Sequence, residues 1–249
     1  MEELQTETAS EMSAAGRLMG IFIEPGRTFH SIAASPGWIL PLLVTIVFVL
    51  ISSNLVINRM GGMEVIIKKQ MESNPKSLER MQQQGMDVDE IARQQGTGVI
   101  GALYSYVIPP VFVIVSVLAL AGIFLLFLSM LGGQPTFRKT LSMVMHVSFA
   151  YYLLHGLLTI LVVFLHSTPQ DIDIRNPVYS NPSSLVENTQ PALKALLGSI
   201  DAFSLWQIWL LGLGLSIVTP NVSRGKAYAL VIGLWAVYVV GKVAMSAIF

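Results

Sequence analysis

Three histidines that follow one another in an apolar stretch are the side chains best suited to metal or proton chemistry in this sequence. His146 and His155 are nine residues apart, and His166 follows eleven residues later. On a helix with roughly 100° between residues, His146 and His155 therefore point to opposite faces. His155 and His166 share a face, but about 16 Å along the helix axis separates them. Their spacing predicts no metal site.

Other signs of catalysis are equally weak. The absence of cysteine excludes disulfides, Cys-ligated clusters and thiol chemistry. No zinc-protease, nucleophile-elbow or phosphate-loop pattern occurs. We interpret His155, which lies beside Tyr151 and Tyr152, as part of an interior polar cluster, with a proton relay as the alternative. Lys242 is close enough to the C-terminus to reach the outer membrane interface. We therefore predict no catalytic residue, no cofactor and no enzyme activity.

The composition indicates what kind of structure must hold these side chains. Of the 249 residues, 53% are hydrophobic and only 12% are charged. Typical soluble domains carry about 25% charged residues, so this chain could not cover a soluble surface. Fifteen basic residues balance fifteen acidic ones, which gives no reason to expect nucleic-acid binding. The composition is that of an integral membrane protein in contact with the lipid bilayer.

Five apolar segments are long enough, or nearly so, to cross a bilayer, which takes about 20 residues of helix. We expect an all-α fold, a polytopic membrane protein that forms a bundle of five transmembrane helices. The predicted organisation is a cytoplasmic and amphipathic region over 1–36 and a membrane domain over 37–249. The first span is expected to remain uncleaved. The spans are predicted at 37–57, 107–131, 141–165, 202–219 and 227–249.

The region before the first span divides into two parts. Residues 1–15 are acidic and polar, which predicts disorder. Apolar residues then recur at helical spacing over 18–33, with a break at Pro25 and a stop at Pro36. Two short amphipathic helices fit this pattern. They would either sense lipid at the membrane surface or form a collar packed on the spans.

The distribution of basic residues predicts the orientation. Arg138, Lys139, Arg224 and Lys226 lie in the two short connections between predicted spans. The longer connections hold more basic residues in total, but residues in short loops close to the spans carry more weight. This weighting places the N-terminus in the cytoplasm and the C-terminus outside.

The two longer connections differ in character. Residues 58–106 form a predicted extramembrane helical loop, because capping signals frame helices at 75–84 and 88–95. This loop is either a solvated connector or a surface for a partner. Residues 168–193 are rich in Pro and Asn, which predicts irregular structure.

Two residues at the start of the fourth span have expected structural roles. Asp201 stands where the free N–H groups of that helix need a cap. Trp206 follows one turn later, where an amphipathic ring could anchor at the membrane interface. Gly212 and Ser216, four residues apart, would allow close packing of helices.

Three short motifs resemble the Yip-one domain family of multi-span membrane proteins. The first precedes the first span, the second connects the second and third spans, and the third leads into the fourth span. Their residues are Pro25, Phe29 and Pro36; Gly132, Gly133 and Phe137; and Asp201, Trp206, Gly212 and Gly214.

The resemblance implies a function as well as a fold. Eukaryotic members interact with Ypt/Rab GTPases, and the family places its N-terminus in the cytoplasm. Only 36 residues precede the first span here, and the third span lacks the proline that many members have near 149–152. These departures argue against Rab-type GTPase binding and favour the prokaryotic branch in a bacterial cytoplasmic (inner) membrane.

The resulting hypothesis is a non-enzymatic membrane protein that organises membrane or protein partners. A membrane-protein partner or a second copy of the chain is expected besides the lipid bilayer. The alternative is a small transporter or a permease subunit. An intramembrane enzyme ranks third, since no paired acid–base residues are evident.

Overall fold

The computed structural model describes residues 12–73, 75–173, 176–186 and 190–248. Within these ranges the regular structure is helical, and no strand occurs. The acidic segment for which we predicted disorder lies mostly outside the described residues. Its last residues differ from that prediction, because helix α1 already begins at Ala14, where the Ser13 side chain caps it.

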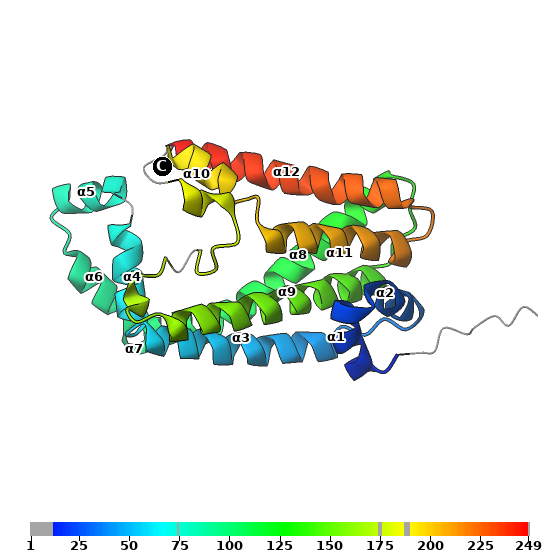
Figure 1. The fold of residues 1–249 in the computed structure, drawn as a ribbon, viewed down its shortest axis with the longest axis horizontal. Coiled ribbons are helices and arrows are strands. Elements are labelled where there is room, and N and C mark those ends of the chain that lie inside the picture. Colours follow the sequence, from blue (N-terminus) through cyan, green and yellow to red (C-terminus); the bar gives the residue numbers. More distant parts are fainter. Residues whose placement is uncertain (1–11, 74, 174–175, 187–189, 249) are drawn as a thin grey trace, which may run out of the picture.

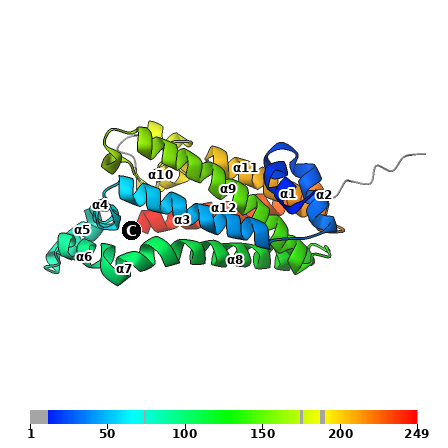
Figure 2. The same cartoon turned by 90° about the horizontal axis from the view of Figure 1, so that it is seen from below.

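Long helices lie side by side and build the body of the protein (Figures 1 and 2). Among the described residues, four helices are long and apolar enough to cross a membrane, and a fifth crossing results if the bent pair α10–α11 counts as one span. The two members of that pair meet at an angle of 51°. The protein is therefore an all-α polytopic membrane protein. The helices are α3 (Ile39–Arg59), α8 (Ile108–Met130), α9 (Phe137–Leu165), α10 (Pro191–Leu197), α11 (Ala202–Val218) and α12 (Arg224–Ile248).

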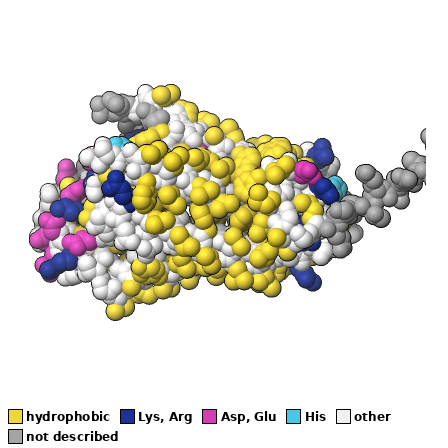
Figure 3. Space-filling model, turned by 60° about the horizontal axis from the view of Figure 1, so that its bottom comes forward, with side chains coloured by type: hydrophobic (Ala, Val, Ile, Leu, Met, Phe, Trp, Pro, Cys, Tyr) yellow, Lys and Arg dark blue, Asp and Glu magenta, His cyan; other side chains and the backbone are white. Residues whose placement is uncertain are grey.

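Successive long helices run in alternating directions between two ends of the bundle (Figure 1). The end that holds α1 (Ala14–Ile23) and α2 (Pro25–Ala34) is called the α2 end. The opposite end, which holds α4 (Met63–Glu72), is called the α4 end. In Figure 3 hydrophobic side chains cover the middle of the visible face, while charged side chains gather towards both ends. This band matches a protein surrounded by hydrocarbon.

The helix that contains the second predicted span begins well before residue 107. It starts with α7 (Gly98–Ala102), passes through a π-helical turn at Leu103–Val107 and continues as α8. Pro109 and Pro110 stand in the first turn of α8, where their missing N–H groups leave the regular hydrogen-bond pattern incomplete. The wider π turn lets the helix continue through this point. The prolines therefore lie within a continuous helix and not at its start.

The α1–α2 pair forms a collar packed on α9 and α11. Ile21 of α1 and both Phe29 and Ile32 of α2 are fully buried in the main hydrophobic core. Side chains that are fully buried in this way are part of the protein interior. In the structure, residues 18–33 thus form a collar whose apolar side chains pack into the protein core.

A buried arginine fixes the collar. Arg17 is 7% exposed. Its Nε donates to Ser31 Oγ at 3.1 Å and to the Met12 carbonyl at 3.2 Å, and its Nη1 donates to the Ser35 carbonyl. A buried charge is costly unless hydrogen bonds replace its water. Arg17 therefore ties α1 to the C-terminal end of α2.

At the α4 end, α4 is followed by α5 (Pro75–Gln83) and α6 (Val88–Gly96). The two helices predicted at 75–84 and 88–95 are present, and the Asp87 side chain caps α6 as expected. Helix α4 was not predicted. Its N-cap is Gly62, which offers no side-chain cap and so leaves no capping signal in the sequence.

The contact between α4 and α6 combines close packing with exposed ion pairs. Ala92 is fully buried, and Gly96 lies directly on the backbone of Glu64. Lys68 of α4 forms an ion pair with Asp89 of α6, and this hydrogen bond raises the pKa of the lysine. The described residues of the predicted loop over 58–106 thus form a group of short helices up to the start of α7.

Candidate functional site

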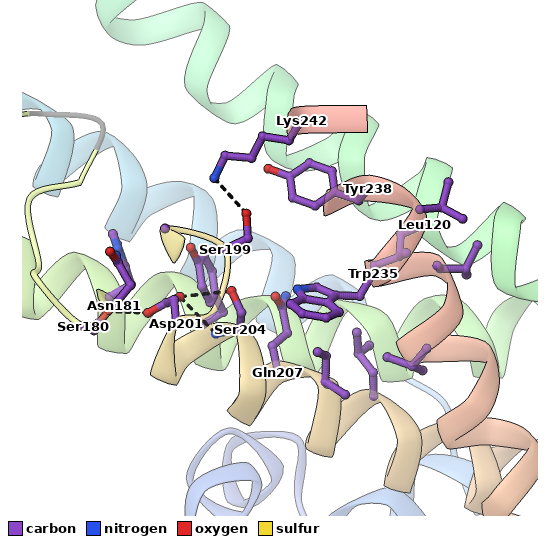
Figure 4. A pocket seen from close by; sticks show the side chains of 18 of the residues that line it. Leu120, Ser180, Asn181, Ser199, Asp201, Ser204, Gln207, Trp235, Tyr238 and Lys242 are labelled. Atoms are coloured by element: carbon purple, nitrogen blue, oxygen red, sulfur yellow. Dashed lines mark hydrogen bonds between the residues drawn. The ribbon is translucent and has the colours of Figure 1, made fainter. Parts of the chain in front are cut away.

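A cavity of about 760 Å³ lies between α8, α9, α11 and α12, under the chain segment that precedes α11 (Figure 4). Its lining changes along the bundle. Towards the α2 end the walls are apolar and include Leu120, Phe124 and Leu234. Towards the α4 end they are polar. The polar side chains used below are Ser180, Ser199, Asp201, Gln207, Trp235 and Lys242.

Asp201 stands at the polar end as the N-cap of α11. Its carboxylate accepts hydrogen bonds from the backbone N–H groups of Phe203 at 3.3 Å and Ser204 at 3.1 Å, and from the Ser204 hydroxyl at 3.0 Å. The Ser180 hydroxyl donates a further hydrogen bond to it. Both carboxylate oxygens are thus engaged in starting α11 and in holding the preceding loop against it.

Lys242 crosses the cavity from α12, and its Nζ donates to Ser199 Oγ at 3.3 Å (Figure 4). The sequence interpretation, in which the side chain reaches the outer interface, did not anticipate this contact. The reason is that α12 packs on α10, and Ser199, which is only 4% exposed, lies between α10 and α11 beside the lysine. Among the described residues no carboxylate forms an ion pair with Lys242.

Aromatic rings form the α9 wall. The His155 ring stacks on Tyr151, with centroids 5.4 Å apart and 16° between the ring planes. Its other neighbour is Phe203, which meets it edge-on at 5.3 Å. Tyr152 contacts Tyr151 edge-on at 5.7 Å. The polar cluster expected around His155 therefore exists as a set of packed rings.

The cavity opens sideways between α8 and α12. Ile123 of α8 and both Val237 and Tyr238 of α12 line it and are 41%, 70% and 63% exposed. Helix α8 packs mainly on α9 and α3, while α12 packs mainly on α11 and α10. These three side chains form the rim of the opening. Because they are large and mostly apolar, the opening faces the hydrocarbon that surrounds the bundle.

The first family motif lies far from the cavity, at the α2 end. Pro25 is the first residue of α2, and Pro36 follows the end of that helix. Phe29 is fully buried between them. Gly214 of α11 leaves room for this ring, because a Cβ there would lie 2.7 Å from Met143 Cγ and 3.1 Å from Phe29 Cε1.

The second motif forms the turn between α8 and α9. Gly132 has φ +82°, a left-handed conformation that favours glycine. A Cβ on Gly133 would lie 2.5 Å from Val222 Cγ2, so this glycine allows the turn to approach the α11–α12 connection. Phe137 begins α9 and is half exposed. Lys226 Nζ donates to the Leu131 carbonyl at 3.2 Å and joins the two turns.

Trp206 and Gly212 pack inside the bundle. Trp206 stacks on Phe22 of α1, with centroids 6.1 Å apart and 21° between the planes. Trp206 thus joins α11 to the collar, and its predicted role as an anchor at the membrane interface stays a prediction. Gly212 lies directly against the Tyr228 ring of α12.

Sequence reasoning missed most of the polar lining. Trp235, Tyr238 and Lys242 follow the spacing i, i+3, i+7, which places them on one face of the last helix. Polar side chains sharing one face of an apolar helix were a detectable signal. Within the described ranges, no group of three or more His, Asp and Glu side chains could hold a metal ion.

Comparison with known proteins agrees with this architecture. The family model of the Yip1 domain matches residues 19–245. "Membrane protein YknW" of Bacillus subtilis (strain 168) is 26% identical over 241 residues, which cover 96% of this chain and 92% of that protein. No solved structure matches the chain. Since the family model covers nearly the whole sequence, this integral membrane protein belongs to the Yip1 domain family.

Proposed function

We propose that this Yip1-family protein is a non-enzymatic membrane protein that organises membrane partners, which enter from the side through the cavity between α8 and α12. The single observation that carries this proposal is the lateral opening beside Ile123, Val237 and Tyr238. Such an opening gives access to molecules dissolved in the bilayer. Concave, largely apolar sites with a few polar groups are typical of binding sites.

The polar groups of the cavity already make hydrogen bonds or ring contacts within the protein, which favours binding over catalysis. A general base needs a lone pair that can reach a substrate proton. Asp201 already accepts four hydrogen bonds within the protein. The imidazole of His155 stacks against Tyr151 and meets Phe203. These groups shape the cavity walls.

We further propose the bacterial cytoplasmic membrane as the location, with the α2 end in the cytoplasm. The support is the basic residues next to the short turns at that end, Arg138, Lys139, Arg224 and Lys226. Reporter fusions after Lys139 and after Arg80 should report cytoplasmic and external positions, respectively. The opposite pair of signals would reverse the orientation.

A small transporter or permease subunit is the second candidate. The observation that favours it is the 51° bend between α10 and α11, which lies at the cavity. Broken helices line the substrate sites of many transporters. Purification from native membranes separates the two candidates, because an ATPase that co-purifies in fixed ratio would favour the permease subunit.

A photo-crosslinking amino acid at Leu234 tests the proposed function. Leu234 lies in the cavity wall, and the matched control position is Val47, an exposed residue of α3 that does not line the cavity. Leu234 should capture a recurrent product in native membranes that Val47 does not. Filling the cavity by Leu120→Trp should abolish that product. Identical products at Leu234 and Val47 would contradict the proposal.

A further inference from the structure

We propose that the cavity is a phospholipid site, in which Lys242 binds the lipid phosphate and one acyl chain lies along the apolar walls of α8, α11 and α12. This inference rests on the proposed function, since it names the chemistry of one partner that enters through the lateral opening. Three independent features support it: the donors at the polar end, their height in the membrane and the length of the apolar wall.

The side chains available at the polar end are hydrogen-bond donors. Within the described part of the chain, Lys242 has a single hydrogen bond, to Ser199. Gln207 and the Trp235 indole N–H have no hydrogen-bond partner among the described residues, and Figure 4 shows both side chains at the cavity. The carboxylate of Asp201 does not compete for the lysine, because no ion pair joins them. A cation beside a hydroxyl group, with Gln207 and Trp235 farther along the cavity, suits an anionic oxygen such as that of a phosphate.

The height of Lys242 matches the level of lipid headgroups. Arg224 begins α12 at the α2 end, and Lys242 follows eighteen residues later on the same helix. At about 1.5 Å per residue, roughly 27 Å separates them along the axis. The hydrocarbon layer is about 30 Å thick. With Arg224 at one interface, the ammonium group therefore lies near the phosphate level of the opposite leaflet.

The apolar wall has the length of one leaflet. Below Lys242, the α12 side of the cavity continues through Leu234 to Val231, and Ile208 and Leu211 of α11 face the same space. Lys242 and Val231 are eleven residues apart, or about 16 Å along the helix. Half of a bilayer core is about 15 Å. An acyl chain attached to a phosphate at Lys242 would thus end beside Val231.

The test uses the full-length protein reconstituted in bilayers with a photoactivatable lipid. The first probe is phosphatidylglycerol with a diazirine in the acyl chain, and the second is diacylglycerol with identical chains. Labelled peptides are identified by mass spectrometry. We expect phosphatidylglycerol to label the cavity walls near Leu120 and Leu234, and diacylglycerol to label them much more weakly.

Variants then test the role of the charge. Lys242→Gln should reduce wall labelling by phosphatidylglycerol roughly tenfold, or by about 1.4 kcal/mol, because the charge-assisted hydrogen bond to the phosphate is lost. Lys242→Arg should retain labelling. The matched control is Lys226→Gln, because that lysine lies at the α2 end and does not line the cavity. Rescue by arginine also shows that the loss in Lys242→Gln is not a loss of folding.

Two outcomes would overturn the inference. One is equal wall labelling by the two lipids, and the other is labelling that Lys242→Gln leaves unchanged. The crosslinking experiment at Leu234 distinguishes these outcomes from a failure of the proposed function. If the crosslinker at Leu234 captures a protein while phosphatidylglycerol never labels the walls, the lipid inference is wrong but the cavity still binds a partner.

Discussion

The two ends of the bundle differ in the size of their hydrophobic core, which is large at the α2 end and small at the α4 end. At the α2 end, Phe29 and Ile32 are fully buried, and the Arg17 guanidinium is enclosed by hydrogen bonds to α2. At the α4 end, Lys68 and Asp89 form an ion pair with side chains 42% and 69% exposed. Buried apolar side chains contribute several times more to stability than exposed ion pairs do.

This contrast indicates where the protein can adapt to a partner. A densely packed α2 end fixes the relative positions of α9 and α11. The polar end of the cavity lies towards the α4 end, where the surrounding segments depend on hydrogen bonds such as Ser180 to Asp201 and Lys69 to Asp171. Local opening is easiest where few apolar contacts are buried.

The largest effect is expected from Phe29→Ala at the α2 end. Removing a fully buried ring should lower the free energy of unfolding by about 3–5 kcal/mol. The matched control is Phe137→Ala, because Phe137 is half exposed and should change stability far less. Thermal unfolding in detergent measures both. Equal effects of the two substitutions would show that the collar is not part of the core.

The next largest effect on stability is expected from a substitution at the close contact between α11 and α9, at the same end. Gly214→Ala places a Cβ 2.7 Å from Met143 Cγ, which should destabilise the protein by roughly 1–3 kcal/mol. Gly233→Ala in α12 is the control, since a Cβ there meets nothing within 4 Å. Its helix should gain up to about 1 kcal/mol from the better propensity of alanine. A neutral Gly214→Ala variant would contradict the tight packing of α11 on α9.

The N-cap of α11, which lies at the cavity, should contribute less to the stability of the protein. Asp201→Ala should cost about 1–2 kcal/mol of stability, because Phe203 and Ser204 lose the acceptor for their N–H groups. Asp201→Asn should be mild, since asparagine also caps helices. Thermal unfolding of both variants checks the order. If Asn abolishes partner binding at unchanged stability, the negative charge itself is functional.

The smallest effect is a pH dependence at the α4 end. Hydrogen bonding from Thr168, together with Lys69, lowers the pKa of Asp171 below its ordinary value of 3.8. The contribution of this contact is therefore complete above pH 3.8 and is lost as the pH falls through the lower value in the folded protein. Hydrogen exchange of α4 should be constant from pH 7 to about pH 4 after correction for intrinsic rates. Loss of protection already near neutral pH would contradict this contact.

The sequence predicted most of the local structure but not the cavity. Apolar length identified the long helices, and the cap at Asp87 identified α6. Helix α4 was not predicted, because Gly62 gives no capping signal. Ser180, Ser199 and Lys242 are far apart in the chain, and only the packing of α10 on α12 brings the last two together. The meeting of these residues at the cavity depends on tertiary contacts, which leave no pattern in the local sequence.

The most direct test of the central claim is the lipid accessibility of the cavity wall. Because the chain contains no cysteine, single cysteines for spin labels can be introduced without removing any. Labels at Leu234, at Val237 on the rim and at the fully buried Leu215 are compared in bilayers by their collision rates with oxygen. The account predicts that the rate at Leu234 approaches that at Val237. A rate at Leu234 as low as that at Leu215 would show that the cavity is closed to the membrane and would contradict the account.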